Sequence, residues 1–117
     1  MPTTALTSAD FASTIEGNDV VLVDFWADWC GPCQRFAPIY EQASGRHDNV
    51  VFGKVDTEDA RDLAAALQIQ SIPTIMGFRD GQLVFRQAGL LNGKQLDSLI
   101  EQIKALDMDE LRKEAKG

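Results

Sequence analysis

The sequence predicts an α/β protein whose central mixed β-sheet has four to five strands and is covered by helices on both faces. Segments with apolar residues at helical spacing alternate with short, nearly continuous apolar runs, the order expected of parallel strands joined by helices. The pair Asp80-Gly81 separates the last two apolar runs and marks a tight hairpin. Helical crossovers favour parallel pairing in the first part of the sheet, and the hairpin adds an antiparallel edge.

Four segments have helical periodicity. The first begins at Thr7 or Ser8 as its cap, the third follows Asp56, and the last begins at Asn92. In the second, Pro38 is expected to kink the helix because proline removes an internal hydrogen bond. The apolar faces of the four segments are, in order, Phe11 and Ile15; Cys33, Phe36, Ala37 and Tyr40; Ala60, Leu63, Ala64 and Leu67; and Leu96, Leu99, Ile100, Ile103 and Leu106.

Four apolar runs are predicted to be strands. Residues 20–26 and 50–55 are almost wholly apolar, which is typical of central strands buried on both faces. Residues 74–78 and 83–85 flank the hairpin turn. The predicted order of elements is therefore α-β-α-β-α-β-β-α.

Length and composition indicate one domain with a single hydrophobic core. The chain has 117 residues, of which 44% are hydrophobic, and we assign the domain to residues 1–106. Residues 107–117 are mostly charged and lose the apolar face, so we expect them to extend the last helix into solvent or to fray.

The net charge of −7 argues against nucleic acid as a partner, because phosphate binding needs a basic surface. The opening segment, MPTTALTSADF, has neither a basic nor an apolar targeting region. The longest unbroken aliphatic run, residues 20–23, is too short to span a membrane. These features predict a cytoplasmic protein without a membrane partner.

Both cysteines of the chain, Cys30 and Cys33, lie in the motif WCGPC at residues 29–33, between a predicted strand and a predicted helix. Unpaired N–H groups and the helix dipole at such a helix start favour a thiolate. We expect Cys30 to lie at or just before the cap and to be the more exposed, and Cys33 to lie partly buried in the first turn. This arrangement suits a disulfide that opens and closes.

Two other interpretations of the pair are weaker. A structural zinc site needs four ligands, and His47 is the only other usual soft ligand, so a zinc site would have to be shared between two chains. A structural disulfide that closes so short a loop would stabilise the fold little, and such bonds are rare in the cytosol.

The motif and several shorter segments resemble the thioredoxin family. The similarity extends over roughly residues 5–106 and is carried by VDFWADWCGPC at residues 23–33, KVD at 54–56, SIPT at 71–74, the Asp80-Gly81 hairpin and Gly89. It implies the thioredoxin fold and a general protein disulfide reductase that works by dithiol–disulfide exchange. It also implies re-reduction by a thioredoxin reductase, diverse disulfide-containing protein substrates, no cofactor or metal, and a monomeric chain.

The resemblance also assigns roles to individual residues. Cys30 would be the nucleophile, Cys33 the resolving cysteine and Asp24 the proton acceptor. A carboxylate inside so buried a run should be protonated more readily than in water, although Asp24 could also be a strand end wetted by solvent. From the residues alone, Lys54 could be a surface lysine, and the bond before Pro73 would be expected to be trans. The family proline at Pro73 is cis and faces the disulfide. The implied substrate surface consists of Trp29, Gly31, Pro32, Ile72, Pro73 and Gly89.

Some residues bear on the direction of the redox reaction. The spacer Gly31-Pro32 carries no cation, which favours a reductant over an oxidant. Gln34 stands where many relatives have lysine, and Asp28 adds a negative charge near the thiols. Two alternatives stay open at this point: an oxidase or isomerase of the same fold, and a non-catalytic module that docks to a partner.

Overall fold

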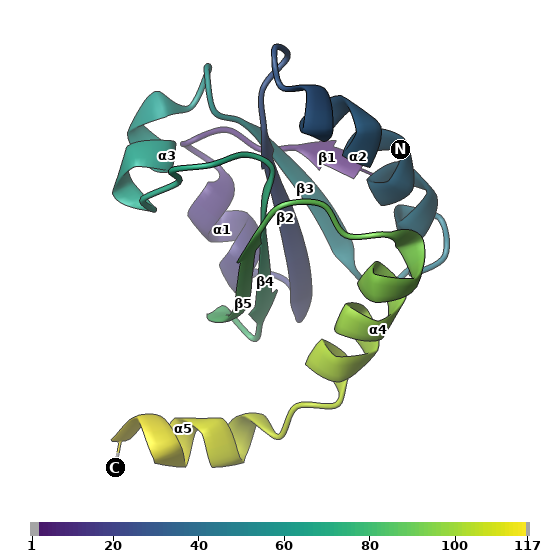
Figure 1. Cartoon of the computed structure of the whole chain (residues 1–117). Coiled ribbons are helices and arrows are strands. Elements are labelled where there is room, and N and C mark those ends of the chain that lie inside the picture. Colours follow the sequence, from purple (N-terminus) through teal and green to yellow (C-terminus); the bar gives the residue numbers. More distant parts are fainter. Residues whose placement is uncertain (1–2, 117) are drawn as a thin grey trace.

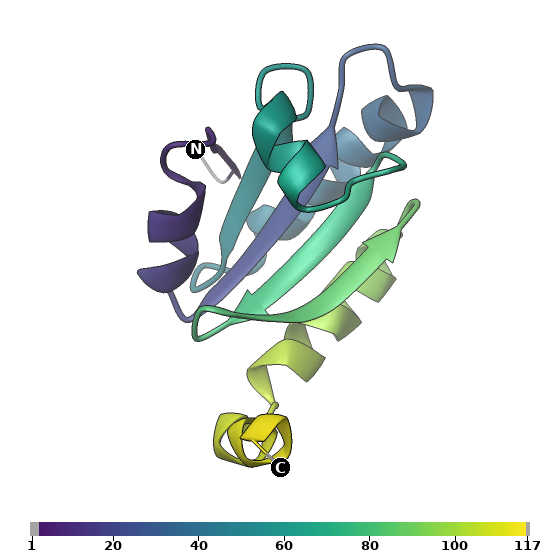
Figure 2. The same cartoon turned by 90° about the vertical axis from the view of Figure 1, so that its left-hand side faces the viewer.

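The computed structural model describes residues 3–116 and contains a five-stranded mixed sheet in the order β1-β3-β2-β4-β5 (Figures 1 and 2). The strands are β1 (Thr3–Ala5), β2 (Val20–Trp26), β3 (Val51–Asp56), β4 (Thr74–Arg79) and β5 (Gln82–Ala88). β1 and β2 each pair in parallel with β3, whereas β4 pairs antiparallel with β2 and β5 antiparallel with β4. The predicted mixed sheet and its antiparallel hairpin are confirmed.

Two strands differ from the prediction. β1 was not predicted, because its three residues have no apolar pattern and become a strand only by pairing with β3 at the sheet edge. β5 is longer than predicted, since it lies at the other edge and most of its residues after Phe85 are polar and exposed, which gives no apolar run to mark its end. At the hairpin, Asp80 and Gly81 both adopt positive φ, at 52° and 81°, as the tight turn requires.

Five helices accompany the sheet within the described residues: α1 (Phe11–Glu16), α2 (Gly31–Ser44), α3 (Arg61–Ala66), α4 (Gly93–Lys104) and α5 (Met108–Lys116). α1 and α3 cover one face of the sheet, and α2 and α4 cover the other (Figure 1). The prediction of helices on both faces is therefore confirmed.

The starts of three helices are shifted from the predicted positions. α1 begins at Phe11 rather than at Thr7 or Ser8, because Thr7 and Asp10 first close a turn. In that turn the Thr7 N–H donates to the Asp10 carboxylate at 2.6 Å, and the Asp10 N–H donates to the Thr7 hydroxyl at 3.3 Å. α3 begins at Arg61, so Ala60, predicted to lie on its apolar face, is instead its N-cap.

The second helix begins at Gly31, two residues before Cys33. Pro32 therefore occupies the second helical position. Pro38 lies inside α2, and the helix continues beyond it to Ser44.

β2 runs through the centre of the sheet and carries a carboxylate into the core. Because side chains alternate along a strand, Val21, Val23 and Phe25 pack toward α1 and α3, whereas Leu22 packs toward α2 and α4. Asp24 lies two residues after Leu22 on the strand, so its side chain points to the same face of the sheet, toward α2. The fold thus places an aspartate beneath the helix that carries the cysteines.

The charged C-terminal segment forms a helix of its own. α4 ends at Lys104, and its last carbonyls are held by Arg79, whose Nη1 donates to Ile103 and Lys104 at 2.8 and 2.9 Å. α5 follows as a separate helix below the sheet in Figure 1, instead of extending α4 or fraying. Within residues 3–116, no helix combines the length and apolar character needed to cross a membrane.

Candidate active site

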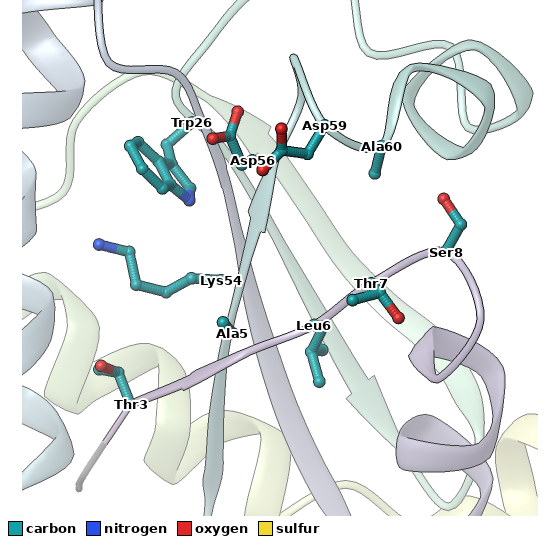
Figure 3. A pocket seen from close by; sticks show the side chains of 10 residues that line it. All are labelled: Thr3, Ala5, Leu6, Thr7, Ser8, Trp26, Lys54, Asp56, Asp59 and Ala60. Carbon is teal, nitrogen blue, oxygen red and sulfur yellow. The ribbon is translucent and has the colours of Figure 1, made fainter.

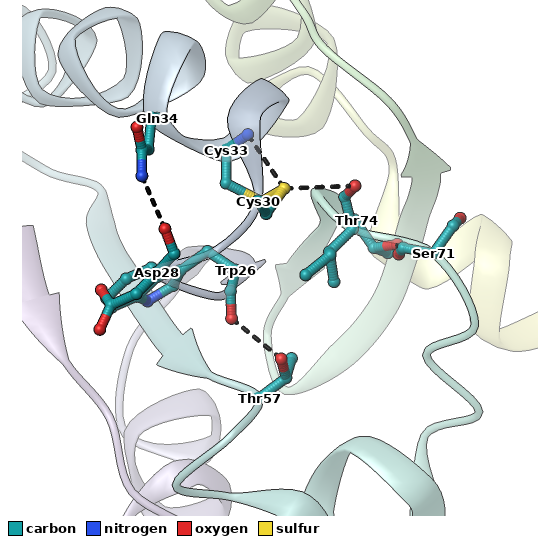
Figure 4. Close-up of a disulfide and its surroundings, with 9 residues drawn as sticks. Trp26, Asp28, Cys30, Cys33, Gln34, Thr57, Ser71 and Thr74 are labelled. Atoms are coloured by element: carbon teal, nitrogen blue, oxygen red, sulfur yellow. Dashed lines mark hydrogen bonds between the residues drawn. A yellow bond between two sulfur atoms is a disulfide. The ribbon is translucent and has the colours of Figure 1, made fainter.

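Cys30 and Cys33 are joined as a disulfide at the start of α2, with their Cα atoms 5.2 Å apart. Cys30 is the N-cap residue, with extended backbone, and Cys33 lies in the first turn. The backbone N–H of Cys33 donates to Cys30 Sγ at 3.1 Å (Figure 4). Because this N–H and the positive end of the helix dipole both point at Cys30, they favour a thiolate there once the bond is reduced.

The expectation that Cys30 is the more exposed cysteine is wrong for this disulfide form. Both cysteines are 3% exposed. Cys30 packs with Ala27 and Ile72, and its sulfur lies 3.6 Å from the Ile72 carbonyl oxygen. A thiol could donate a hydrogen bond to that carbonyl, whereas a disulfide sulfur has no proton to donate. The two sulfurs therefore differ in their polar neighbours and not in burial.

Asp24 is fully buried, and neither carboxylate oxygen has a hydrogen-bond partner among the described residues. Burial raises the pKa of Asp24 from 3.8 to about 7, an effect that the positive charge of Lys54 partly offsets. Lys54 is its direct neighbour in the register of β2 and β3. The interpretation of Asp24 as a solvent-wetted strand end is therefore excluded.

Lys54 and Trp26 lie together near this carboxyl group. Lys54 Nζ is 4.9 Å from the centroid of the Trp26 ring, a cation–π arrangement. Trp26 is half-buried, and its indole N–H is buried without a partner among the described residues. Both side chains line a cavity of about 450 Å³ between β1 and the end of β3, together with Asp56 and Asp59 (Figure 3).

Tyr40 of α2 completes the surroundings of Asp24. Its hydroxyl donates to the Gly53 carbonyl of β3 at 2.8 Å. Burial raises the pKa of Tyr40 well above its ordinary value, and the nearby Asp24 charge raises it further. Tyr40 therefore stays neutral and contributes no charge to the site.

A groove lies beside the disulfide. It has a volume of about 310 Å³ and is lined by Trp29, Thr57, Ile69, Gln70, Ser71 and Ile72. Trp29 is 70% exposed, so its indole ring lies on the surface and not in the core. An exposed indole beside a groove lined by both apolar and polar residues is a suitable surface for a peptide.

The remaining residues of the predicted substrate surface are not among those that line this groove. Gly31 and Pro32 are exposed on the first turn of α2. The peptide bond between Ile72 and Pro73 is cis, as the resemblance implied. Gly89 has a φ of 102° and donates its N–H to the Pro73 carbonyl at 2.8 Å, which joins the end of β5 to the start of β4.

Two polar contacts near the cysteines were not found from the sequence. Gln34 Nε2 donates to the Asp28 carbonyl at 2.6 Å, and the Thr57 hydroxyl donates to the Trp26 carbonyl at 3.0 Å (Figure 4). Both contacts hold the loop that precedes Cys30. No pattern in the sequence predicts them, because each depends on how the loop turns back over the end of the sheet.

The histidine considered as a zinc ligand takes part in a different interaction. His47 Nε2 lies 2.8 Å from the Asp97 carboxylate, which Arg46 also contacts at 3.0 Å. This cluster ties the end of α2 to α4. Across residues 3–116, no three His, Cys, Asp or Glu side chains are grouped as metal ligands would be.

A mixed sheet of this order, with a cysteine pair closed across a helix start and a cis-proline opposite it, defines a protein disulfide oxidoreductase. The thioredoxin family model matches residues 2–105, and the chain belongs to the thioredoxin family. Its Cys30–Cys33 pair therefore performs dithiol–disulfide exchange.

Individual relatives agree with this assignment. The chain is 50% identical to a putative thioredoxin 2 of Streptomyces coelicolor over 95% of its own length and 83% of the relative. It is 40% identical to thioredoxin 1 of Plasmodium falciparum, covering 83% of this chain and 92% of that one. The solved structure of a mutant thioredoxin from Halobacterium salinarum superimposes with a TM-score of 0.82 at 34% identity, covering 90% of this chain and 93% of that one.

Proposed function

We propose that this protein reduces disulfides of other proteins, with Cys30 as nucleophile and Cys33 as resolving cysteine. The observation that carries the proposal is the hydrogen bond from the Cys33 N–H to Cys30 Sγ at the start of α2. It stabilises negative charge on one sulfur of the pair, and a stabilised thiolate is the attacking species in disulfide exchange.

The exchange proceeds in two steps. The Cys30 thiolate attacks one sulfur of the substrate disulfide, so that a mixed disulfide forms and one substrate thiolate leaves. The Cys33 thiolate then attacks Cys30 Sγ, which releases the second substrate thiolate and leaves the Cys30–Cys33 disulfide. Two electrons pass from the dithiol to the substrate, so the exchange itself needs no prosthetic group.

We assign Asp24 as the acceptor of the Cys33 proton in the second step. A carboxyl group with a pKa of about 7 is suited to exchange protons near neutral pH. Its position on the α2 side of β2 supports the assignment. So does the absence of any protein donor to its oxygens within the described residues, since such a donor would lower its basicity.

The substrate surface consists of Trp29, Gly31, Pro32, Ile72, Pro73 and Gly89. These residues offer an exposed ring, a groove and backbone groups, but few directional side-chain donors. An extended segment would bind mainly through its backbone, as in strand addition. We therefore expect weak and promiscuous binding, in which the exposure of a substrate disulfide decides whether it is reduced.

A working cycle needs a source of electrons, and we assign this role to a thioredoxin reductase. A reductant of this kind suits a reducing compartment, which supports a cytoplasmic location. One chain contains both cysteines and the groove, so a monomer is sufficient. Cell fractionation and sedimentation would test location and oligomeric state, and a periplasmic or obligate dimeric protein would contradict these assignments.

Turnover tests the direction of the reaction. With NADPH and a thioredoxin reductase, the protein should reduce the disulfides of insulin, and NADPH consumption should follow its concentration. A strongly oxidising measured potential would instead indicate an oxidase or isomerase. No turnover with several reductases would favour a binding module.

Trapping tests the roles of the two cysteines. The Cys33→Ser variant should accumulate a mixed disulfide with substrate through Cys30, because the resolving attack is lost. The matched Cys30→Ser variant should trap little. The Cys33 backbone N–H stabilises a thiolate on Cys30, and Cys33 Sγ receives no such hydrogen bond in this structure. Trapping by Cys30→Ser alone would reverse the assignment.

A further inference from the structure

One wall of the groove beside the disulfide is a segment without regular structure. Between the end of α3 and the start of β4, Ile69, Gln70, Ser71 and Ile72 line the groove, and Trp29 and Thr57 complete it. The Ile69 N–H donates back to the Ala64 carbonyl of α3 at 2.9 Å, and the Thr74 hydroxyl donates to the Ser71 carbonyl at 2.5 Å. With few other backbone hydrogen bonds of its own, the segment also depends on contacts at its two ends. The residues that hold those ends therefore contribute to the shape of the groove.

The edge strand β5 holds both ends of this segment. At the near end, Arg86 Nη1 donates to the Leu67 carbonyl at 2.7 Å, and Nη2 donates to the Gln68 carbonyl at 2.6 Å. At the far end, the Gly89 N–H just after β5 donates to the Pro73 carbonyl at 2.8 Å. In Figure 2 the chain leaves α3, passes the end of β5 and enters β4.

The strand register explains why Arg86 reaches these carbonyls. Arg86 lies directly opposite Met76 in the pairing of β4 and β5, so the two side chains share one face of the sheet. Met76 packs there in the cluster that also contains Leu67 and Ile69. Arg86 therefore lies on the edge strand, on the face of the sheet that is covered by the end of α3.

Arginine matches the chemistry of this helix end. Gln68 adopts a positive φ of 55°, which turns the chain out of the helix. Carbonyl groups at a helix C-terminus carry partial negative charge. The planar guanidinium can donate to two of them at once, whereas a lysine ammonium would act as a single point charge.

We propose that Arg86 is a positioning residue for protein substrates, because it fixes the end of α3 and with it the groove wall from Ile69 to Ile72. The inference rests on the proposed function, in which this groove receives the substrate segment. Arg86 bonds the carbonyls of Leu67 and Gln68, which precede the groove wall. A small disulfide reagent that reacts at Cys30 without filling the groove should therefore be insensitive to Arg86.

The test compares a protein disulfide with a small aromatic disulfide as substrates of the Arg86→Gln variant. KM for the protein disulfide should rise by about tenfold or more, the factor that corresponds to losing one charged hydrogen bond, with kcat unchanged. The rate with the small reagent should match the parent, which also shows that the variant is folded. Arg86→Lys should give an intermediate KM.

Arg61→Gln is the matched control. Arg61 lies on α3, the helix whose end Arg86 contacts, and pairs with Glu58 at 3.1 Å, so the change removes the same charge from this part of the molecule but breaks no contact to the groove wall. A parent-like KM in Arg86→Gln would overturn the proposal. So would an equal loss with both substrates, or the same KM rise in Arg61→Gln, because the effect would then lie in the cysteines or in the charge.

Trp29→Ala separates this inference from the proposed function. If Trp29→Ala raises KM for the protein disulfide while Arg86→Gln does not, the groove binds substrate and only the role of Arg86 is wrong. If neither variant changes KM, the groove is not the substrate surface and the assignment of the site itself fails.

Discussion

Among single residues, Asp24 is the one whose chemistry depends most on its surroundings. In the unfolded chain its carboxyl group titrates near 3.8, whereas burial raises the pKa to about 7 in the folded protein. Between these two values the unfolded chain releases a proton that the folded chain retains. The free energy of unfolding therefore falls as pH rises from about 4 to about 7 and levels off above that range.

The Asp24→Asn variant should remove this dependence. The difference between 3.8 and about 7 corresponds to about 4 kcal/mol at high pH. A buried amide without partners costs about 1–3 kcal/mol, so we expect a net stabilisation of about 2 kcal/mol above neutral pH. Urea unfolding of parent and variant at pH 5 and pH 8 measures the change.

The exposed Asp48 provides the control for this substitution. Asp48→Asn replaces the same group on the surface and should leave the pH profile of the parent intact. If Asp24→Asn and the parent lose stability in parallel as pH rises, Asp24 titrates as an ordinary carboxyl group. In that case its assignment as proton acceptor also loses its basis.

At the scale of elements, α4 shows how a local signal in the sequence determines a boundary. The Asn92 side chain accepts from the Gln95 N–H at 2.8 Å, and the Gln95 side chain accepts from the Asn92 N–H at 2.9 Å. This capping box closes the loop that begins at Gly89, after β5, and starts α4. The start of α4 is thus held by groups only three residues apart in the chain.

Asn92→Ala should destabilise the protein by about 1 kcal/mol, because the first turn of α4 loses a side-chain acceptor. Exchange with a small disulfide should be unchanged, since the cap does not contact the cysteines. Chemical unfolding measures the first quantity and a stopped-flow rate the second. Asn49→Ala, in an exposed loop, should change neither, and an equal loss of stability in both variants would show that the cap is not responsible.

For the molecule as a whole, we propose that residues 1–106 form the complete exchange domain and that α5 is an appendage. Met108 at the start of α5 is buried, at 6% exposed, and Arg112 lies 3.9 Å from Asp80 at the β4–β5 turn. The contacts of Arg79 to the end of α4 do not involve α5. The disulfide, Asp24 and the groove all lie within the first 106 residues.

Deletion of residues 107–117 should therefore leave disulfide exchange unchanged. The free energy of unfolding should fall by about 2 kcal/mol, which is the contribution of one buried methionine side chain. Insulin reduction and thermal unfolding of the shortened protein measure the two effects, and Met108→Ala in the full chain should reproduce most of the stability loss. A large loss of activity in the shortened protein would assign α5 to the function.

The sequence by itself determined the alternation of helices and strands, the hairpin at Asp80-Gly81 and the position of the cysteines at a helix start. These features follow from local chemistry: apolar periodicity, residues that tolerate positive φ, and a cap followed by proline. The resemblance to a known family added the cis bond before Pro73. That feature could not be derived from the residues alone, because X-Pro bonds are mostly trans.

Only the tertiary structure decided the properties that depend on what lies across the fold. The raised pKa of Asp24 follows from burial between β2 and α2, and the equal burial of Cys30 and Cys33 follows from packing against Ile72. β1 exists only through its pairing with β3, and Arg86 reaches the end of α3 only because β5 occupies the sheet edge beside it. Each of these effects involves residues that are distant in the chain. Desolvation and hydrogen bonding act between neighbours in space, and local sequence patterns do not specify those neighbours.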